Sequence, residues 1–182
     1  MDDPRNVVDK YKGVPMDEIV ADLDAQGSSL EIALDNVARD YNMGTIIRSA
    51  NAFGVRRVHI VGRRQWNKRG AMMTDKYLHV AYYETTAEFM KAIQGKVLVA
   101  VDNVGGSIPL EQADMPANSV LLFGAEGPGI GDELLACADS VVKIEQYGST
   151  RSLNVGVAAG IVMHEWTRRN QRNDRQNINN TV

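Results

Sequence analysis

Short apolar runs alternate with amphipathic stretches along most of this chain, and the two patterns predict different elements. Runs rich in aliphatic and aromatic residues predict strands at 30–37, 56–61, 79–83, 96–101, 119–123 and from 141 onward. Stretches with helical spacing predict helices at 45–53, 86–93 and 132–138, and a last helix over 154–169. Strands that alternate with helices predict an α/β fold built on a parallel sheet.

Three stretches of different composition divide the chain. Residues 1–29 are polar, apart from apolar residues at helical spacing between Met16 and Leu23 that predict a short peripheral helix. Residues 30–172 form one predicted domain, because a chain of 182 residues with 44% apolar content can bury one good core. The polar sequence of residues 173–182, NDRQNINNTV, predicts a disordered tail.

The last predicted helix begins with an unusual set of small residues. Gly156 and Gly160 each cost about 1 kcal/mol relative to Ala in a helix, which predicts close approach of another backbone or a ligand. Ser152 and Asn154 are residue types that cap a helix or orient a polar ligand at its free N–H groups. An ordinary capped helix packed tightly on a parallel sheet would explain the same residues.

The charge of the chain is unevenly distributed. The net charge is -3, yet residues 41–80 hold eight basic residues against the single acid Asp75, a local charge of +7. Such an asymmetry predicts a face that attracts phosphate groups on an otherwise acidic protein. A solvated charged loop is the alternative interpretation of this segment.

Several classes of site and location are not favoured by the sequence. The single Cys137 excludes an intramolecular disulfide, and the three histidines show no metal-ligand spacing, so we expect no metal. The first ten residues are acidic without an apolar core segment, and the longest apolar stretch, 155–163, is too short to span a membrane. We therefore expect a soluble, cytoplasmic protein that does not enter membranes.

A glycine-rich loop, GAEGPGIG at 124–131, follows the strand predicted at 119–123. Its glycine spacing does not match the dinucleotide fingerprint, and the chain has no P-loop, so neither a nicotinamide-dependent oxidoreductase nor a P-loop hydrolase is supported. Ligands of open α/β folds bind where such loops leave the carboxyl edge of the sheet, which predicts a cofactor pocket here. Glu126 could be a helix-terminal charge, or it could hold a cation or a guanidinium.

Three ordered segments together resemble one family. They are Asn42-Met-Gly-Thr-Ile-Ile-Arg48 with Ala52-Phe-Gly54, then Leu122-Phe-Gly-Ala-Glu-Gly-Pro-Gly-Ile130, then Ser152-Leu-Asn-Val-Gly-Val-Ala-Ala-Gly-Ile161. Between residues 30 and 170 the chain resembles the SpoU family, the TrmH-like branch of the SPOUT RNA methyltransferases. Glu145 stands where proline is common in the family, Ala125 where Asn or Ser is common, and Gly156 where Ser is common.

The resemblance implies methyl transfer from S-adenosylmethionine to a ribose 2′-hydroxyl of tRNA or rRNA, on an α/β fold with a trefoil-knotted C-terminal region. The cofactor-binding residues that it implies are Gly124, Ala125, Ile144, Gln146, Leu153 and Asn154. The catalytic residue that it implies is Arg48, with Asn42, Glu126, Ser152 and Asn154 orienting it or the target ribose. An RNA-binding or assembly factor with a vestigial pocket is the alternative, although the intact Arg48, Glu126 and Asn154 argue against it.

Arg48 needs a role that suits its chemistry. A guanidinium stays protonated in proteins, so it is a poor general base. We expect Arg48 to grip a phosphate near the target ribose and to stabilise negative charge that builds on the 2′-oxygen. A surface arginine that pairs with Asp40 or Glu126 is the simpler alternative.

RNA contacts and a partner subunit complete the expectations. The long loop after the strand at 56–61 carries four bases and a tryptophan that could hold phosphates and one stacked base: Arg63, Arg64, Trp66, Lys68 and Arg69. The last helix is apolar over more than the one stripe that a sheet covers, which predicts burial against a partner. The family resemblance implies a homodimer in which Arg48 of one subunit approaches the cofactor held by the other.

Overall fold

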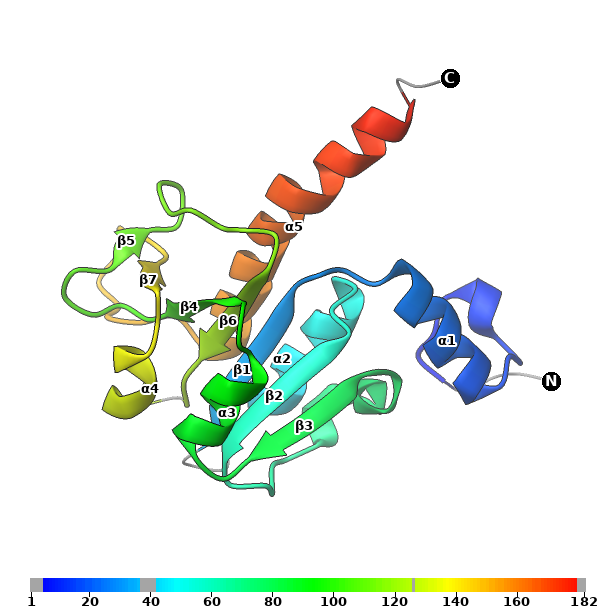
Figure 1. Ribbon diagram of the computed structural model, residues 1–182, viewed down its shortest axis with the longest axis horizontal. Helices are drawn as coiled ribbons and strands as arrows, with labels where there is room; N and C mark the ends of the chain where they lie inside the picture. Colours follow the sequence, from blue (N-terminus) through cyan, green and yellow to red (C-terminus); the bar gives the residue numbers. More distant parts are fainter. Residues whose placement is uncertain (1–4, 37–41, 126, 180–182) are drawn as a thin grey trace.

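A single parallel sheet of seven strands forms the centre of the protein (Figure 1). The computed structural model describes residues 5–36, 42–125 and 127–179. The strand order is β3-β2-β1-β6-β4-β7-β5, and every pair of neighbours is parallel. The strands are β1 Glu31–Asn36, β2 Arg57–Gly62, β3 His79–Tyr83, β4 Val97–Val101, β5 Ile108–Pro109, β6 Ser119–Phe123 and β7 Ser140–Lys143. The predicted α/β fold with a parallel sheet is confirmed.

Helices cover both faces of this sheet. The α-helices are α1 Met16–Gln26, α2 Asn42–Ala52, α3 Thr86–Ala92, α4 Asp132–Ala136 and α5 Val155–Asn179, and the 3-10 helices are η1 Asp9–Tyr11, η2 Arg69–Ala71 and η3 Thr74–Tyr77. Helices α2 and α5 pack on one face, where Ile47 and Trp166 join a large core with Leu121. Helices α3 and α4 pack on the other face around Phe89 and Leu122. Successive residues of β6 therefore contribute to opposite layers, and all five are buried, as a central parallel strand requires.

The register of the central strands aligns their carboxyl ends at one edge of the sheet. Leu34 of β1 and Val101 of β4 both pair with Phe123, the last residue of β6. The segments that follow β4 and β6 therefore leave the carboxyl edge side by side. This arrangement confirms the position predicted for the glycine-rich loop.

The N-terminal helix α1 confirms the predicted peripheral helix. It lies beside the sheet in Figure 1 and packs its Ile19 against Tyr11 and Tyr77 in a small separate core. The domain boundary near residue 30 coincides with the start of β1.

The C-terminal helix α5 extends through Asn179. The segment contains no glycine or proline that would stop a helix. The disorder predicted for residues 173–182 stays a prediction.

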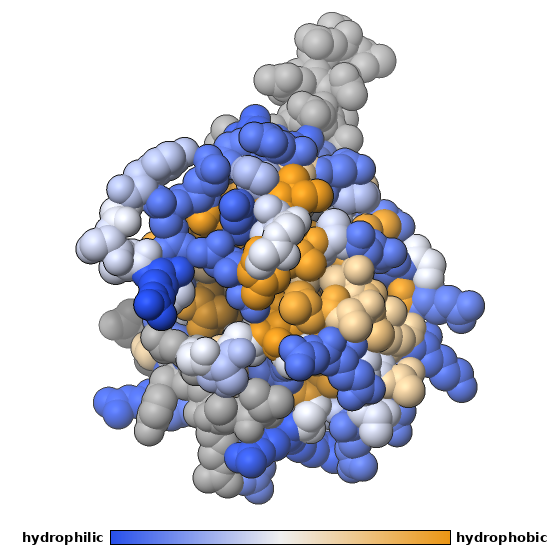
Figure 2. Space-filling view, turned by 90° about the vertical axis from the view of Figure 1, so that its left-hand side faces the viewer, coloured by the Kyte–Doolittle hydropathy of each residue, from blue (hydrophilic) through white to orange (hydrophobic). Residues whose placement is uncertain are grey.

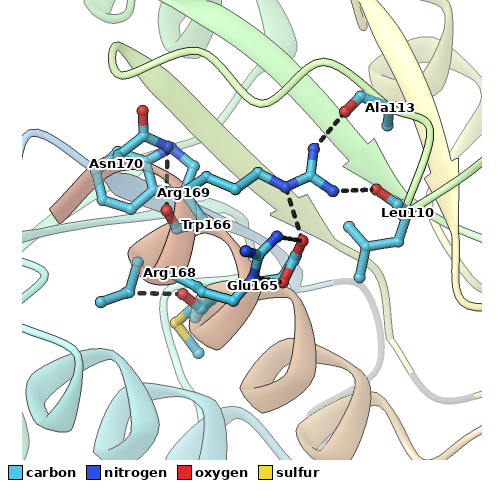
Figure 3. Close-up of polar contacts among 9 residues, drawn as sticks. Leu110, Ala113, Glu165, Trp166, Arg168, Arg169 and Asn170 are labelled. Carbon is cyan, nitrogen blue, oxygen red and sulfur yellow. Dashed lines mark hydrogen bonds and ion pairs between the residues drawn. The ribbon is translucent and has the colours of Figure 1, made fainter. Parts of the chain in front are cut away.

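A polar network fastens α5 to the segment between β5 and β6 (Figure 3). Arg169 donates through Nη1 to the Ala113 carbonyl at 2.6 Å and through Nη2 to the Leu110 carbonyl at 2.7 Å. Glu165 accepts from both Arg168 and Arg169, and these partners hold the pKa of its carboxyl at about 2. The network fixes where α5 crosses the sheet.

The trefoil knot stays a prediction, because strand order and pairing do not define how the chain is threaded.

The basic loop between β2 and β3 folds as two 3-10 helices rather than as an open loop. Gly44 at the start of α2 and Gly70 in η2 let the two backbones touch, since a Cβ on Gly44 would lie 2.7 Å from the Ala71 nitrogen. Met72 and Met73, which join η2 to η3, have φ values of 47° and 65°. Close packing on α2 therefore determines the shape of this loop.

Over the described ranges, no helix is both long enough and apolar enough to span a bilayer.

Candidate active site

A cavity lies at the carboxyl edge of the sheet, where the sequence predicts a cofactor pocket. It is formed by the segments that follow β4, β6 and β7 and by the first turn of α5. Six predicted site residues line it: Gly124, Ala125, Ile144, Gln146, Ser152 and Leu153. Segments far apart in sequence thus meet at one place.

The glycine-rich loop closes tightly over the end of β6. Ala125 and Gly129 exchange backbone hydrogen bonds of 3.1 and 3.0 Å, and a Cβ on Gly124 would overlap the carbonyl group of Gly129. Gly127 and Gly129 have φ values of 97° and 75°, which side chains other than glycine rarely adopt. The glycines therefore serve a tight reversal of the chain and leave backbone atoms exposed to the cavity.

Two buried or half-buried carboxylates hold the end of this loop. Asp35, at the end of β1, accepts a 2.8 Å hydrogen bond from the Gly131 N–H. Asp102, just after β4, accepts a 3.2 Å bond from the Ile130 N–H. Because β1 and β4 flank β6, consecutive amides of the loop are held from both sides. Burial raises the pKa of the Asp35 carboxyl, and the bond from Gly131 opposes that rise.

Sequence reasoning missed both of these acids, although each left a signal. Asp35 and Asp102 each end an apolar strand and each precede an asparagine, Asn36 and Asn103. A charge at the carboxyl end of a buried strand is unusual enough to indicate a positioned loop or ligand.

The start of α5 is capped by Asn154. Its Oδ1 accepts from the N–H groups of Gly156 at 3.0 Å and Val157 at 3.2 Å, and its Nδ2 donates to Asn42 Oδ1 at 2.9 Å. The predicted capping role is confirmed, and two predicted site residues are brought into contact. Asn154 does not itself appear among the cavity-lining residues.

The two helix glycines behave differently. A Cβ on Gly156 would lie 3.1 Å from Thr45 Cγ2, so the predicted close approach of another element is confirmed there. A Cβ on Gly160 would meet no atom within 4 Å outside its own helix, so the described part of this chain provides no such neighbour. Close packing within one subunit therefore accounts for only the first glycine.

Arg48 lies away from the cofactor cavity. It is exposed on α2 and lines a different cavity, between α2 and the N-terminal segment. Within the described ranges it forms no ion pair. Glu126 and Asp40, its two suggested partners, lie outside the described residues.

The predicted RNA-binding loop is anchored to the domain by its aromatic residue. Trp66 is half-buried against the main core and donates through Nε1 to the Tyr82 hydroxyl at 3.3 Å. Lys68 Nζ lies 5.3 Å from the Trp66 ring centre and 3.0 Å from Asp75, and Arg64 lies over Tyr82. The four basic residues are all exposed: Arg63, Arg64, Lys68 and Arg69.

Comparison with known proteins agrees with this site. A tRNA (guanosine(18)-2′-O)-methyltransferase of Escherichia coli K12 is 29% identical over 147 residues, which are 78% of this chain and 64% of that protein. The crystal structure of the A. aeolicus TrmH/SpoU tRNA modifying enzyme matches with a TM-score of 0.76 over 87% of this chain and 84% of that chain, at 24% identity.

A second solved structure is an AdoMet-bound rRNA methyltransferase from Sinorhizobium meliloti, with 30% identity and a TM-score of 0.69 over 78% of this chain and 56% of that chain. The chain thus spans less than two thirds of the length of both the Escherichia coli and the Sinorhizobium proteins. The sequence model of the family described as "SpoU rRNA Methylase family" matches residues 29–164. The chain therefore belongs to the SpoU rRNA methylase family.

Proposed function

We propose that this protein transfers a methyl group from S-adenosylmethionine to a ribose 2′-hydroxyl of RNA. One observation carries the proposal: segments of a SpoU family chain that are distant in sequence converge on a cavity at the carboxyl edge of the sheet, and three glycines are among its lining residues. The similar Sinorhizobium meliloti structure is described as AdoMet-bound. We propose that the reaction takes place in the cytoplasm, as expected from the sequence.

The lining of the cavity fits this cofactor. Gly124 and Gly129 both line the cavity, and a Cβ on Gly124 would overlap the Gly129 carbonyl group, so the loop that borders the cavity depends on these glycines. Gln146 Oε1 is buried without a hydrogen-bond partner among the described residues. An adenine amino group is a suitable donor for such an acceptor. We assign cofactor binding to the backbones of Gly124, Ile144 and Leu153, with contributions from Ala125, Gln146 and Asn154.

When bound, S-adenosylmethionine supplies an electrophilic methyl group, so the chain mainly has to position the ribose. Asn154, two residues after the cavity-lining Ser152, is linked by its side chain to Asn42, and this pair would orient the target ribose with Glu126. Arg48 would grip the neighbouring phosphate and stabilise negative charge on the 2′-oxygen, because its guanidinium stays protonated. Alignment of the two reactants can account for several kcal/mol of the barrier.

The position of Arg48 supports a homodimer with shared sites. Arg48 does not line the cofactor cavity of its own subunit. Leu153, Val157 and Ile161 lie at four-residue spacing at the start of α5 and are 36%, 53% and 40% exposed. Figure 2 shows apolar residues gathered in the middle of one face with polar residues around them. A two-fold partner on this part of α5 would cover these side chains and bring its Arg48 toward the cofactor.

The basic loop supports RNA as the substrate. Its four exposed cations stand on two packed 3-10 helices whose shape is fixed by Gly44, Gly70 and Trp66. We propose that Arg63, Arg64, Lys68 and Arg69 hold phosphates of the RNA, with Trp66 supporting the loop or a stacked base. The described residues contain no cluster of three or more His, Cys, Asp or Glu side chains that could hold a metal ion.

The deciding experiment incubates the protein with labelled S-adenosylmethionine and unmodified total RNA, and then maps the labelled nucleoside. We expect 2′-O-methylated nucleosides from tRNA or rRNA, and none with Gly124→Val, whose side chain would overlap Gly129. Label on a base would contradict the proposed reaction. RNA binding without any methyl transfer would instead favour an assembly factor with a vestigial pocket.

A further inference from the structure

A second cavity is lined by residues of the N-terminal segment, α1 and α2. We call it the N-terminal cavity and define it by Tyr11, Leu23, Arg48, Asn51, Arg56 and Tyr77. Its volume of about 720 Å³ falls within the roughly 300–1,000 Å³ that is common for ligand pockets. The cavity is therefore large enough for a small organic ligand.

Two buried polar atoms in this lining have no hydrogen-bond partner among the described residues, Asn51 Oδ1 and Arg56 Nη2. The Arg56 side chain is only 11% exposed, its stem packs over Gly27, and its Nε donates to Asp24 at 2.8 Å. The guanidinium is thus held in place, and its Nη2 donor has no hydrogen-bond partner among the described residues. Native proteins rarely leave buried donors and acceptors unpaired, so this pair indicates a ligand with one acceptor and one donor.

The charge of the lining favours an anionic ligand. It contains the three cations Lys10, Arg48 and Arg56, and no described lining residue is an acid. Lys10 is engaged by Asp22 at 2.9 Å and Arg56 by Asp24 at 2.8 Å, whereas Arg48 forms no ion pair within the described ranges. An exposed guanidinium at the cavity is a good partner for a phosphate.

Together these features fit a nucleotide better than a bare phosphate. A nucleotide carries both donors and acceptors on its base, so it can offer a donor to Asn51 and an acceptor to Arg56. A phosphate accepts hydrogen bonds and would leave Asn51 Oδ1 unpaired. The apolar walls around Leu23 and the two tyrosines suit the faces of a base.

The cavity is connected to the active site by α2. Asn42, at the start of α2, bonds to Asn154, and Asn51 lies about 14 Å further along the helix at 1.5 Å per residue. Arg48 stands between them. We propose that the N-terminal cavity binds one unstacked nucleotide of the substrate RNA, other than the nucleotide that is methylated; this rests on the proposed function.

The test compares RNA affinity for Asn51→Leu, which removes the acceptor, and Arg56→Lys, which keeps the charge but removes the planar guanidinium. Gln94→Leu, an exposed amide just after α3, serves as the matched control. Filter binding with unmodified total tRNA and with rRNA should show about tenfold weaker binding of the preferred RNA for each variant, and none for the control. The KM for RNA should rise likewise, while kcat at saturating RNA and cofactor affinity stay unchanged.

Two outcomes would overturn the inference. One is wild-type RNA affinity in both variants with cofactor binding and melting temperature preserved. The other is tight binding of a free nucleoside monophosphate, measured by equilibrium dialysis, that the RNA does not displace. Failure of the proposed function would give a different result. The wild-type protein would then transfer no methyl group, while both variants could still bind RNA more weakly than the wild type.

Discussion

Asn154 Nδ2 donates a 2.9 Å hydrogen bond to Asn42 Oδ1, which joins the first turn of α2 to the cap of α5 across 112 residues of sequence. The same Asn154 side chain accepts from two amides of α5. One residue therefore both ends the closing loop and ties two of the three family motifs together.

These two roles of Asn154 can be separated by substitution. Asn154→Ala should lower the free energy of unfolding by about 1 kcal/mol, because the cap is lost. Asn154→Ser should keep most of that stability, since serine caps well but is too short to replace the bond to Asn42. Urea unfolding measures the stability of the two variants. We expect both variants to lose methyl transfer, as measured by labelled-methyl incorporation. Wild-type turnover in the serine variant would show that the link to Asn42 has no part in the reaction.

The strands were the most predictable part of the fold. The predicted ends of β3 and β6 coincide with the observed ones, because in each the run of aliphatic and aromatic residues fills most of the strand. The start of α2 was less predictable. It begins at Asn42 rather than at residue 45, where contacts with Gly70 and Asn154 from distant parts of the chain stabilise a first turn that has no apolar pattern.

The candidate site also has parts that could be predicted from the sequence and parts that could not. Six of the residues predicted for the site line the cavity, because glycine and capping residues leave a local signal. Their roles stay a prediction. Asp35 and Asp102 were missed, since their partners are backbone amides 96 and 28 residues away. The surroundings of Arg48 were also unpredictable, because they depend on how the N-terminal segment packs on α2.

The Asp35 carboxyl should make stability depend on pH. Burial raises its pKa above the ordinary value of 3.8, so the folded protein holds this proton at pH values where the unfolded chain has released it. The folded state then binds more protons, and stability from this group falls as pH rises from about 4 through the raised pKa. Asp35→Asn, which cannot ionise but still offers an acceptor to Gly131, should lack this fall.

Urea unfolding of both proteins across a pH series measures the difference. Asp35→Ala is the companion variant: an unpaired Gly131 N–H should lower the free energy of unfolding by about 1–3 kcal/mol and weaken cofactor binding by loosening the loop. Parallel pH profiles for the wild type and Asp35→Asn would mean that the carboxyl does not titrate abnormally.

The basic loop should govern the salt dependence of RNA binding. Each phosphate contact adds about 0.7 to 0.9 to the slope of log affinity against log salt. Replacing Arg63, Arg64, Lys68 and Arg69 together by glutamine should therefore flatten the slope and leave cofactor affinity unchanged. Lys91→Gln on α3, across the sheet, is the control. An unaltered slope would mean that the loop is a solvated charged surface that does not contact RNA phosphates.

Arg48 and Gly124 should affect different steps. Arg48→Ala should abolish methyl transfer at saturating RNA but change cofactor affinity by less than about threefold, since the lost interaction belongs to the transition state. Gly124→Val should block cofactor binding while the protein stays folded, because the added side chain overlaps the Gly129 carbonyl group. Calorimetric titration with S-adenosylmethionine separates the two. Unchanged affinity in a folded Gly124→Val protein would place the cofactor elsewhere.

A mixture of these two inactive proteins tests whether the site is shared between subunits. In a hybrid dimer, the cofactor cavity of the Arg48→Ala subunit faces the intact Arg48 of its partner, so one of two sites is complete. After subunit exchange, each hybrid should show about half the wild-type activity, and random exchange makes about half of the dimers hybrid. Exchange is confirmed with differently tagged subunits, and each protein mixed with itself is the control. If confirmed hybrids stay inactive, each subunit uses its own Arg48, and a fully active monomer in solution would refute the dimer itself.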